Sequence, residues 1–198
     1  MRSPLEPDAA REVPAPEPSG SDRDLLQRGR EGDPAAFQSL LRPHLPALLG
    51  LARRCCSDPH WAEDLVQEAL LRAFRALPSF RGEASLRTWL FRILVRLAGE
   101  PERWRRGTPA VPLEVDVPDT LPDAAVHGAM TRELQARLAE AMERLTNLQR
   151  TALHLRASEG LDYRAIATVL GITDVAARMH VLAARRKVME RLQEYLEP

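Results

Sequence analysis

The sequence has few cysteines and few aromatic residues, and it lacks both a long hydrophobic run and a net charge. Its only two cysteines, Cys55 and Cys56, are adjacent, a spacing that neither closes a disulfide loop nor matches the paired ligands of a zinc site. We interpret both as free thiols. A metal or redox sensor formed with Asp58 and His60 is the less favoured alternative, because a closed metal site needs more ligands.

Membrane proteins and enzymes are the classes that these absences disfavour. The longest apolar runs, such as residues 45–52, are well short of the roughly 20 residues that a membrane span needs. Acids and prolines follow Met1 where a signal peptide would have its apolar core. Glycine-rich phosphate loops are missing, and the five histidines are scattered. We therefore expect a cytoplasmic protein without membrane insertion, catalytic residues, cofactor or bound metal.

The charges cancel overall but are unevenly distributed. Lys plus Arg and Asp plus Glu each number 28, so only a local excess of one sign could attract phosphate. Residues 81–106 contain seven arginines and three glutamates, whereas residues 107–130 contain four acids, four prolines and no Lys or Arg. We predict a disordered proline-rich leader at 1–20, a helical domain at 21–107, a flexible acidic linker at 108–130 and a second helical domain at 131–198. The fold class is all-α.

Helix-start signals support this assignment. Asp33-Pro34 and Asp58-Pro59 each combine an N-cap residue with proline in the first helical position. Ser85 can cap a further helix. Pro43 and Pro46 predict a kink in the chain between these starts, since proline removes a helical hydrogen bond.

The helix that starts at Pro59 is predicted to have two different faces. Its apolar stripe consists of Val66, Leu70, Ala73 and Leu77, which recur at helical spacing and should pack inward. The residues outside the stripe are polar and free to contact a partner: Asp64, Gln67, Glu68 and Arg72.

Residues 163–188 have the pattern of a helix-turn-helix. Asp162 can cap the first helix, Gly171 suits the left-handed turn, and Thr173 can cap the second helix. Four residues of the second helix form its inward stripe: Ala177, Val181, Ala184 and Val188. An ordinary helical hairpin with a solvated basic face remains the alternative.

A helix-turn-helix that reads DNA inserts the start of its second helix into the major groove. The candidate contacts are therefore the outward residues of that helix, together with a later arginine for a backbone phosphate: Thr173, Asp174, Ala176, Arg178, Met179, His180 and Arg185.

Two regions of the chain resemble the sigma factors of bacterial RNA polymerase. Residues 32–37 (GDPAAF), 62–68 (AEDLVQE), 80–82 (FRG) and 88–93 (TWLFRI) are similar to the second conserved region of that family. Residues 149–150 (QR), 153–159 (LHLRASE), 166–167 (IA) and 170–172 (LGI) are similar to the fourth region. The resemblance covers residues 21–192 without a middle domain, which points to the extracytoplasmic-function group.

The resemblance implies a role for each region. The polar residues Asp64, Gln67, Glu68 and Arg72 would dock on the β′ clamp helices of core RNA polymerase, and the fourth region would touch the β flap and read the minus-thirty-five element. Recognition and melting of the minus-ten element would fall to Arg87, Trp89, Arg92, Arg96, Arg103, Trp104, Arg105 and Arg106. For Trp89, packing in the core remains the alternative.

The resemblance also implies regulation by a partner protein. An anti-sigma factor would hold the chain inactive, and that partner could also keep the chain at the membrane. The active form would associate with the nucleoid. The competing interpretation is a helix-turn-helix repressor or activator that binds duplex DNA without polymerase and uses its first domain to dimerise. The sigma-factor interpretation expects two separate helical modules on the flexible linker.

Overall fold

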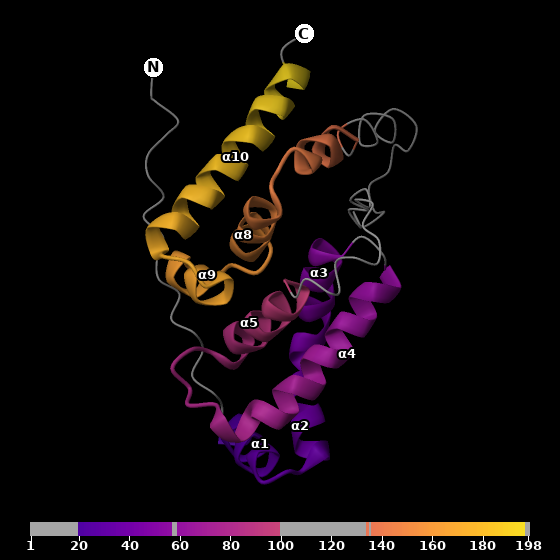
Figure 1. Ribbon diagram of the computed structural model, residues 1–198, viewed down its shortest axis with the longest axis vertical. Helices are drawn as coiled ribbons and strands as arrows, with labels where there is room; N and C mark the ends of the chain where they lie inside the picture. The colour runs from indigo at the N-terminus through magenta and orange to yellow at the C-terminus, as the bar shows by residue number, and fades with distance from the viewer. Residues whose placement is uncertain (1–19, 57–58, 100–133, 135, 197–198) are drawn as a thin grey trace.

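The chain folds into two groups of helices (Figure 1). The computed structural model describes residues 20–56, 59–99, 134 and 136–196, and these residues contain helices and turns but no strand. The N-terminal module comprises α1 (Gly20–Arg30), α2 (Pro34–Leu41), α3 (Leu45–Cys55), α4 (Pro59–Ala76) and α5 (Leu86–Ala98). The C-terminal module comprises a helical segment at 136–143 and α8 (Asn147–Ala157), α9 (Tyr163–Leu170) and α10 (Asp174–Leu196). The all-α prediction is confirmed. Residues 1–19 of the leader and the linker lie outside the described residues, while Gly20, predicted as the end of the leader, begins α1.

The predicted helix starts are present in the N-terminal module. The Asp33 carboxylate accepts hydrogen bonds from the backbone N–H groups of Ala35 at 2.9 Å and Ala36 at 3.2 Å, and the Ser85 hydroxyl accepts one from Thr88 at 3.1 Å. Helix α4 starts at Pro59, although its predicted cap Asp58 is not among the described residues.

The kink expected from the two prolines takes the form of a short 3₁₀ turn. This turn, η1 (Arg42–His44), separates α2 from α3 and contains Pro43, while Pro46 lies in the first turn of α3. Early helix positions suit proline because their N–H groups have no intrahelical partner. The irregular turn therefore relieves the cost that an interior proline would have.

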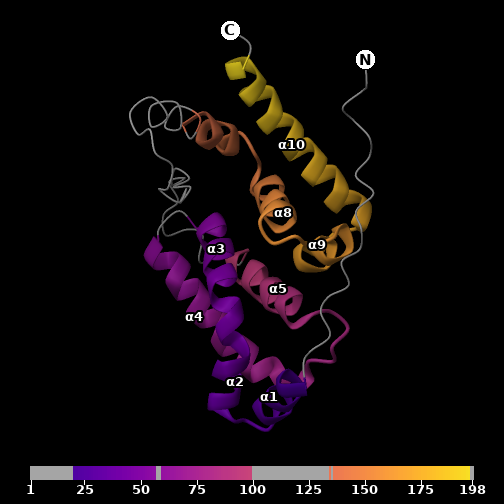
Figure 2. The ribbon, with the colours of Figure 1, turned by 180° about the vertical axis from the view of Figure 1, so that it is seen from behind.

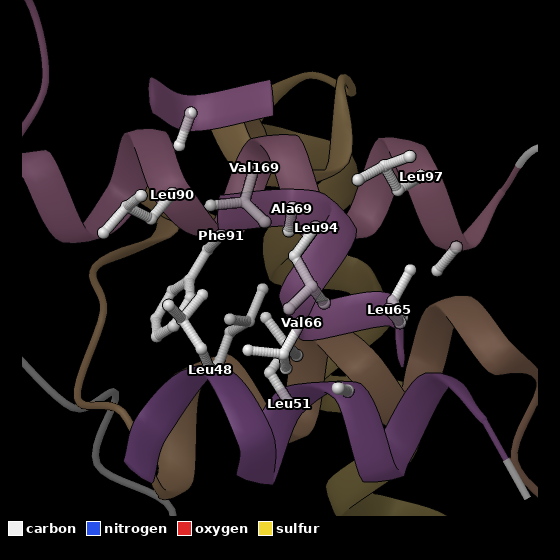
Figure 3. Close-up of a cluster of buried hydrophobic side chains, with 14 of the residues drawn as sticks. Leu48, Leu51, Leu65, Val66, Ala69, Leu90, Phe91, Leu94, Leu97 and Val169 are labelled. Carbon is white, nitrogen blue, oxygen red and sulfur yellow. The ribbon is translucent and has the colours of Figure 1, made fainter. Parts of the chain in front are cut away.

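The core of the N-terminal module lies between α3, α4 and α5 (Figure 3). Val66, Ala73 and Leu77 are buried as predicted, whereas Leu70 is half-buried. The buried face of α4 is wider than the predicted stripe, since it also includes Ala62, Leu65 and Ala69. The opposite face of α4 stays at the surface.

The C-terminal module contains the predicted helix-turn-helix. Asp162 caps α9 through the Ala165 N–H at 2.6 Å, and Thr173 caps α10 through the Ala176 N–H at 3.2 Å. Gly171 has φ +69°, a conformation that costs residues with a β-carbon roughly 1 kcal/mol. The chain direction turns by 101° between α9 and α10, within the range typical of this motif. The inward residues of α10 are buried except Val188, which is half-buried.

The two modules are in contact. Helix α9 packs on α5 and α8 packs on α3, an arrangement visible from both sides (Figures 1 and 2). One apolar cluster contains residues of both modules, among them Phe91 and Leu94 of α5 and Val169 of α9. Two helical modules were predicted from the sequence, but the expectation that they are separate is wrong, because α9 packs on α5 and α8 on α3.

Candidate polymerase and nucleic-acid interfaces

The four polar residues predicted for the partner-binding face share one side of α4. Asp64 and Gln67 are exposed, while Glu68 and Arg72 are half-exposed. The Arg72 Nε donates a hydrogen bond to Glu68 Oε1 at 3.0 Å, an i,i+4 ion pair that orders this part of the helix surface.

Leu71 is a member of this face that sequence reasoning missed. Its side chain is 53% exposed, and it lies one helical turn after Gln67 and Glu68. An exposed leucine surrounded by polar residues can enter an apolar pocket of a partner, the arrangement that dominates many interfaces. The only signal in the sequence is an apolar residue outside the predicted stripe.

The candidate DNA-binding residues of α5 differ in how far they are exposed to solvent. Arg96 is exposed, whereas Trp89 and Arg92 are half-buried. The Trp89 ring packs against Phe80 with 5.0 Å between centroids, so much of this side chain contributes to the core. Arg103, Trp104, Arg105 and Arg106 lie outside the described residues.

Arg87 contacts the C-terminal module. Its guanidinium forms an ion pair with the Glu159 carboxylate through Nη2, and Nη1 donates a hydrogen bond to the Glu159 carbonyl at 3.3 Å. The guanidinium also lies 5.4 Å from the centroid of the Phe91 ring, within cation–π range. Glu159 belongs to the connection between α8 and α9, where Gly160 with φ +67° turns the chain.

His154 lies beside this ion pair. Its side chain is 8% exposed, and its Nε2 is 3.5 Å from Glu159 Oε1 without a hydrogen-bond partner among the described residues. Burial, followed by the nearby charges of Arg54 on α3 and Arg87 on α5, lowers the pKa of His154 to about 4. The folded chain therefore holds a neutral imidazole at neutral pH.

We expect acid to destabilise the folded chain partly through His154. The pKa of His154 is about 4 in the folded chain and ordinarily 6.5, so its effect on the free energy of unfolding is most favourable above pH 6.5, where the imidazole is neutral in both states. As the pH falls from 6.5 toward 4, the unfolded chain takes up the proton first, and the free energy of unfolding decreases by about 3 kcal/mol in total. Urea unfolding at pH 7 and pH 5 should show a larger loss of unfolding free energy for wild type than for His154→Gln. Equal losses would contradict the assignment, since the two chains share every other titrating group.

The start of α10 presents most of its predicted contacts to solvent. Thr173, Asp174, Arg178, Met179 and Arg185 are exposed, and Ala176 and His180 are half-exposed.

The Arg178 guanidinium lies 5.0 Å from the centroid of the Tyr163 ring, and Arg156 lies 5.1 Å from the same ring. Val175, which is 73% exposed, was not among the predicted contacts. Together with Met179, it gives the first turns of α10 an apolar as well as a cationic surface.

Two basic residues near the end of α10 support the fold of the module. Arg191 pairs with Glu140 of the segment 136–143, with 2.6 Å between Nη2 and Oε2. Lys187 donates a hydrogen bond to the Gln149 side chain at 3.1 Å. Both side chains fix α10 against the preceding helices.

Both cysteines are free of disulfide bonds, and Asp58, which the sensor alternative includes, lies outside the described residues. No group of three or more His, Cys, Asp or Glu residues that could hold a metal ion occurs there. Burial, followed by the neighbouring Cys56, raises the pKa of Cys55 to about 12, while a hydrogen bond with Thr151 of α8 acts in the opposite direction. A thiol with so high a pKa forms little reactive thiolate. Among described helices, none taken singly is long and apolar enough to cross a membrane.

The fold and these surfaces define a two-module helical protein with a helix-turn-helix, and comparison with known proteins identifies its family. The models of Sigma-70 region 2 and Sigma-70 region 4 match residues 40–106 and 135–188. The RNA polymerase sigma-H factor of Pseudomonas aeruginosa is 34% identical over 184 residues, which cover 88% of this chain and 95% of that protein. The ECF RNA polymerase sigma factor SigM of Mycobacterium tuberculosis is 32% identical over 176 residues, covering 89% and 86%. The chain belongs to the extracytoplasmic-function group of the sigma-70 family.

Solved structures show the same architecture. CnrH in complex with the cytosolic domain of CnrY matches with a TM-score of 0.64 and 25% identity, covering 88% of this chain and 98% of CnrH. The sigma factor RpoE from Bartonella quintana, in complex with the anti-sigma factor NepR, also matches with a TM-score of 0.64, with 27% identity over 79% and 96% of the two chains.

Proposed function

We propose that this chain is an alternative sigma factor that binds core RNA polymerase and directs it to promoters. The observation that carries the proposal is that candidate docking residues and candidate DNA-reading residues occupy exposed faces of two different modules. One chain can then hold the polymerase with α4 and the promoter with α10. Its action is binding in the cytoplasm, without catalysis or a cofactor of its own.

In this function α4 docks on the β′ clamp helices through Asp64, Gln67, Glu68 and Arg72. Leu71 supplies the apolar contact at the centre, since polar residues that surround an apolar anchor exclude water from it. The C-terminal module contacts the β flap.

The start of α10 reads the minus-thirty-five element in the major groove. Arg178 is suited to a guanine, which offers two acceptors to a guanidinium, and Val175 and Met179 are suited to thymine methyl groups. Arg185 lies two helical turns later and contacts a phosphate.

The minus-ten element contacts α5 and the basic residues that follow α5 in the sequence. Arg92 and Arg96 supply positive charge for a separated strand, and Trp89 supplies part of an apolar surface for an unstacked base. Minus-ten contacts are also proposed for four residues that follow α5 in the sequence: Arg103, Trp104, Arg105 and Arg106.

We further propose control by an anti-sigma factor. Both structural matches are complexes of a protein with a second chain, and one of those second chains is named as an anti-sigma factor. Such a partner would keep this chain from polymerase, at the membrane if the partner is anchored there, until a signal releases it to the nucleoid.

Transcription in vitro tests the proposal. The chain is added to core RNA polymerase on a fragment library of its own genome, and the RNA 5′ ends are sequenced. We expect initiation at a small set of sites that share two sequence elements. Failure to associate with core polymerase in a pull-down, combined with tight duplex binding without polymerase, would instead support the regulator interpretation.

A further inference from the structure

The only two thiols of the chain lie next to each other at one end of α3. Cys55 is the last residue of this helix, and Cys56 follows it with an extended backbone, φ −125° and ψ 140°. Neither forms a disulfide, and both side chains are half-buried. Both also pack against the apolar cluster that contains residues of the two modules. The fold therefore holds the two sulfur atoms in one place.

The two thiols influence each other. Burial is the largest cause of the raised pKa of Cys55, and the charge of Cys56 is the second. Thr151 of α8, which is 7% exposed, forms a side-chain hydrogen bond with Cys55. The pair thus lies beside the contact between α3 and α8, as two sulfur donors within reach of each other.

The common uses of paired cysteines do not suit this position. The Cα atoms of adjacent residues are about 3.8 Å apart across a trans peptide, whereas disulfides usually span about 4.4 to 6.8 Å between Cα atoms. A disulfide between Cys55 and Cys56 would therefore be strained. A structural zinc ion needs four ligands, and the described residues contain no group of three or more His, Cys, Asp or Glu that could hold a metal ion. The pair suits a ligand that takes two sulfurs and leaves them unbonded to each other.

We propose that Cys55 and Cys56 form a dithiol site for compounds of trivalent arsenic. Sulfur ligands select soft partner atoms, and trivalent arsenic is such an atom. Its pyramidal geometry places two sulfur ligands on the same side, and the arsenic keeps them further apart than a disulfide bond does. The inference goes beyond the proposed function and does not rest on it, because neither polymerase nor DNA takes part in the site.

Binding is a condensation that needs no oxidant or reductant. With phenylarsine oxide, the S–H bonds of both cysteines break, two As–S bonds form, and the oxygen leaves with both protons as one water molecule. Arsenic stays trivalent, and the sulfurs keep their oxidation state. The high pKa of Cys55 slows reactions that need a thiolate. It does not prevent this step, because each proton leaves with the oxygen.

The adjacency of the two sulfurs makes the binding tight. The first As–S bond holds the arsenic beside the second sulfur, so the second bond forms within one molecule, and such linkage strengthens binding by about 10² to 10⁴. The backbone of the site is already fixed, since the Cys56 N–H donates a hydrogen bond to the Ala52 carbonyl at 2.8 Å. Little backbone freedom therefore remains to be lost on binding.

Intact-protein mass spectrometry of the folded full-length chain tests the site, with phenylarsine oxide as the probe. We expect one arsenic per chain, the loss of one water molecule from the summed masses, and no thiol left to react with a maleimide. The adduct should survive excess glutathione, which is a monothiol, and be released by the dithiol dimercaptopropanol. Arsenous acid is the second probe, and it should bind with loss of two water molecules and keep one hydroxyl on arsenic.

Substitutions separate the pair from its single members. Cys55→Ser and Cys56→Ser should each weaken the binding of phenylarsine oxide about 100-fold, because the second As–S bond is lost. The matched control adds Ser39→Cys to the Cys56→Ser chain. Ser39 is exposed on α2, so this chain again has two thiols but no adjacent pair, and it should bind as weakly as Cys56→Ser. Circular dichroism should give all three variants the helical signal of wild type.

Four results would overturn the inference. They are no adduct with either probe, two arsenic atoms per wild-type chain, release of the wild-type adduct by glutathione, and equal affinity of wild type and the Ser39→Cys control. The first three are measured on wild type alone, so they decide the matter even where a variant does not fold. An adduct with phenylarsine oxide but not with arsenous acid would support the dithiol site and assign it to organic arsenicals.

Discussion

Leu71→Asp should weaken binding to core RNA polymerase by about 30-fold. Leu71 is 53% exposed, so it contributes little to the fold, and the loss arises in the complex. A central apolar anchor is worth 2 kcal/mol or more at an interface, and a carboxylate in its pocket would be desolvated without a partner. Fluorescence anisotropy of labelled protein titrated with core polymerase measures the change.

Leu134→Asp is the matched control for this substitution. Leu134 is 43% exposed and belongs to the other module, so the same chemical change there should leave core binding within about twofold, the scatter of near-neutral interface positions. Circular dichroism should give both variants the helical signal of wild type. Equal binding by the two variants would contradict the assignment of the α4 face.

Arg178→Ala should reduce transcription from the natural promoter by roughly 5- to 150-fold, the range that corresponds to loss of one bidentate base contact. Arg178 is exposed at the start of α10, where the helix-turn-helix geometry directs a side chain into the major groove. The loss should be largest on the preferred promoter and smaller on promoters altered at the contacted base pair. Run-off transcription with matched promoter variants measures both.

Arg191→Ala is the contrasting variant. Arg191 is 22% exposed and paired with Glu140, so its loss should lower the thermal midpoint of the C-terminal module while promoter preference remains the same. If both variants altered promoter preference equally, insertion of the first turns of α10 into the groove would be excluded.

The features of the fold that were predicted from the sequence are helix caps and a turn, and these depend on residues close together in the chain. Asp33, Ser85, Asp162 and Thr173 each cap the helix that immediately follows, within three residues of the bonded N–H. The positive φ of Gly171 is likewise a local requirement of the turn. Such features are set by short-range geometry and can be read from a single sequence.

The contact between the modules depends on distant residues and was not predicted. Arg87 and Glu159 are 72 positions apart, and the sequence around each residue does not indicate that the two form an ion pair. Val169 of α9 is 1% exposed and belongs to the same apolar cluster as Phe91 and Leu94 of α5.

The candidate sites were also predicted incompletely from the sequence. Periodicity predicted a buried stripe on α4, but it gave no role to Leu71 outside that stripe or to Val175 at the start of α10. Leu71 and Val175 were therefore missed, although both are exposed. Arg191 pairs with Glu140, which lies 51 positions earlier, and no local pattern in the sequence indicates this pair.

The guanidinium groups of Arg156 and Arg178 both lie near the ring of Tyr163. This arrangement affects how Arg178 discriminates between bases. An arginine already restrained by an aromatic neighbour has given up part of its rotational freedom before any DNA arrives, so less entropy remains to be lost on binding. Tyr163 can thereby sharpen sequence preference without touching the double helix, and the selectivity of this chain extends to a residue behind the reading surface.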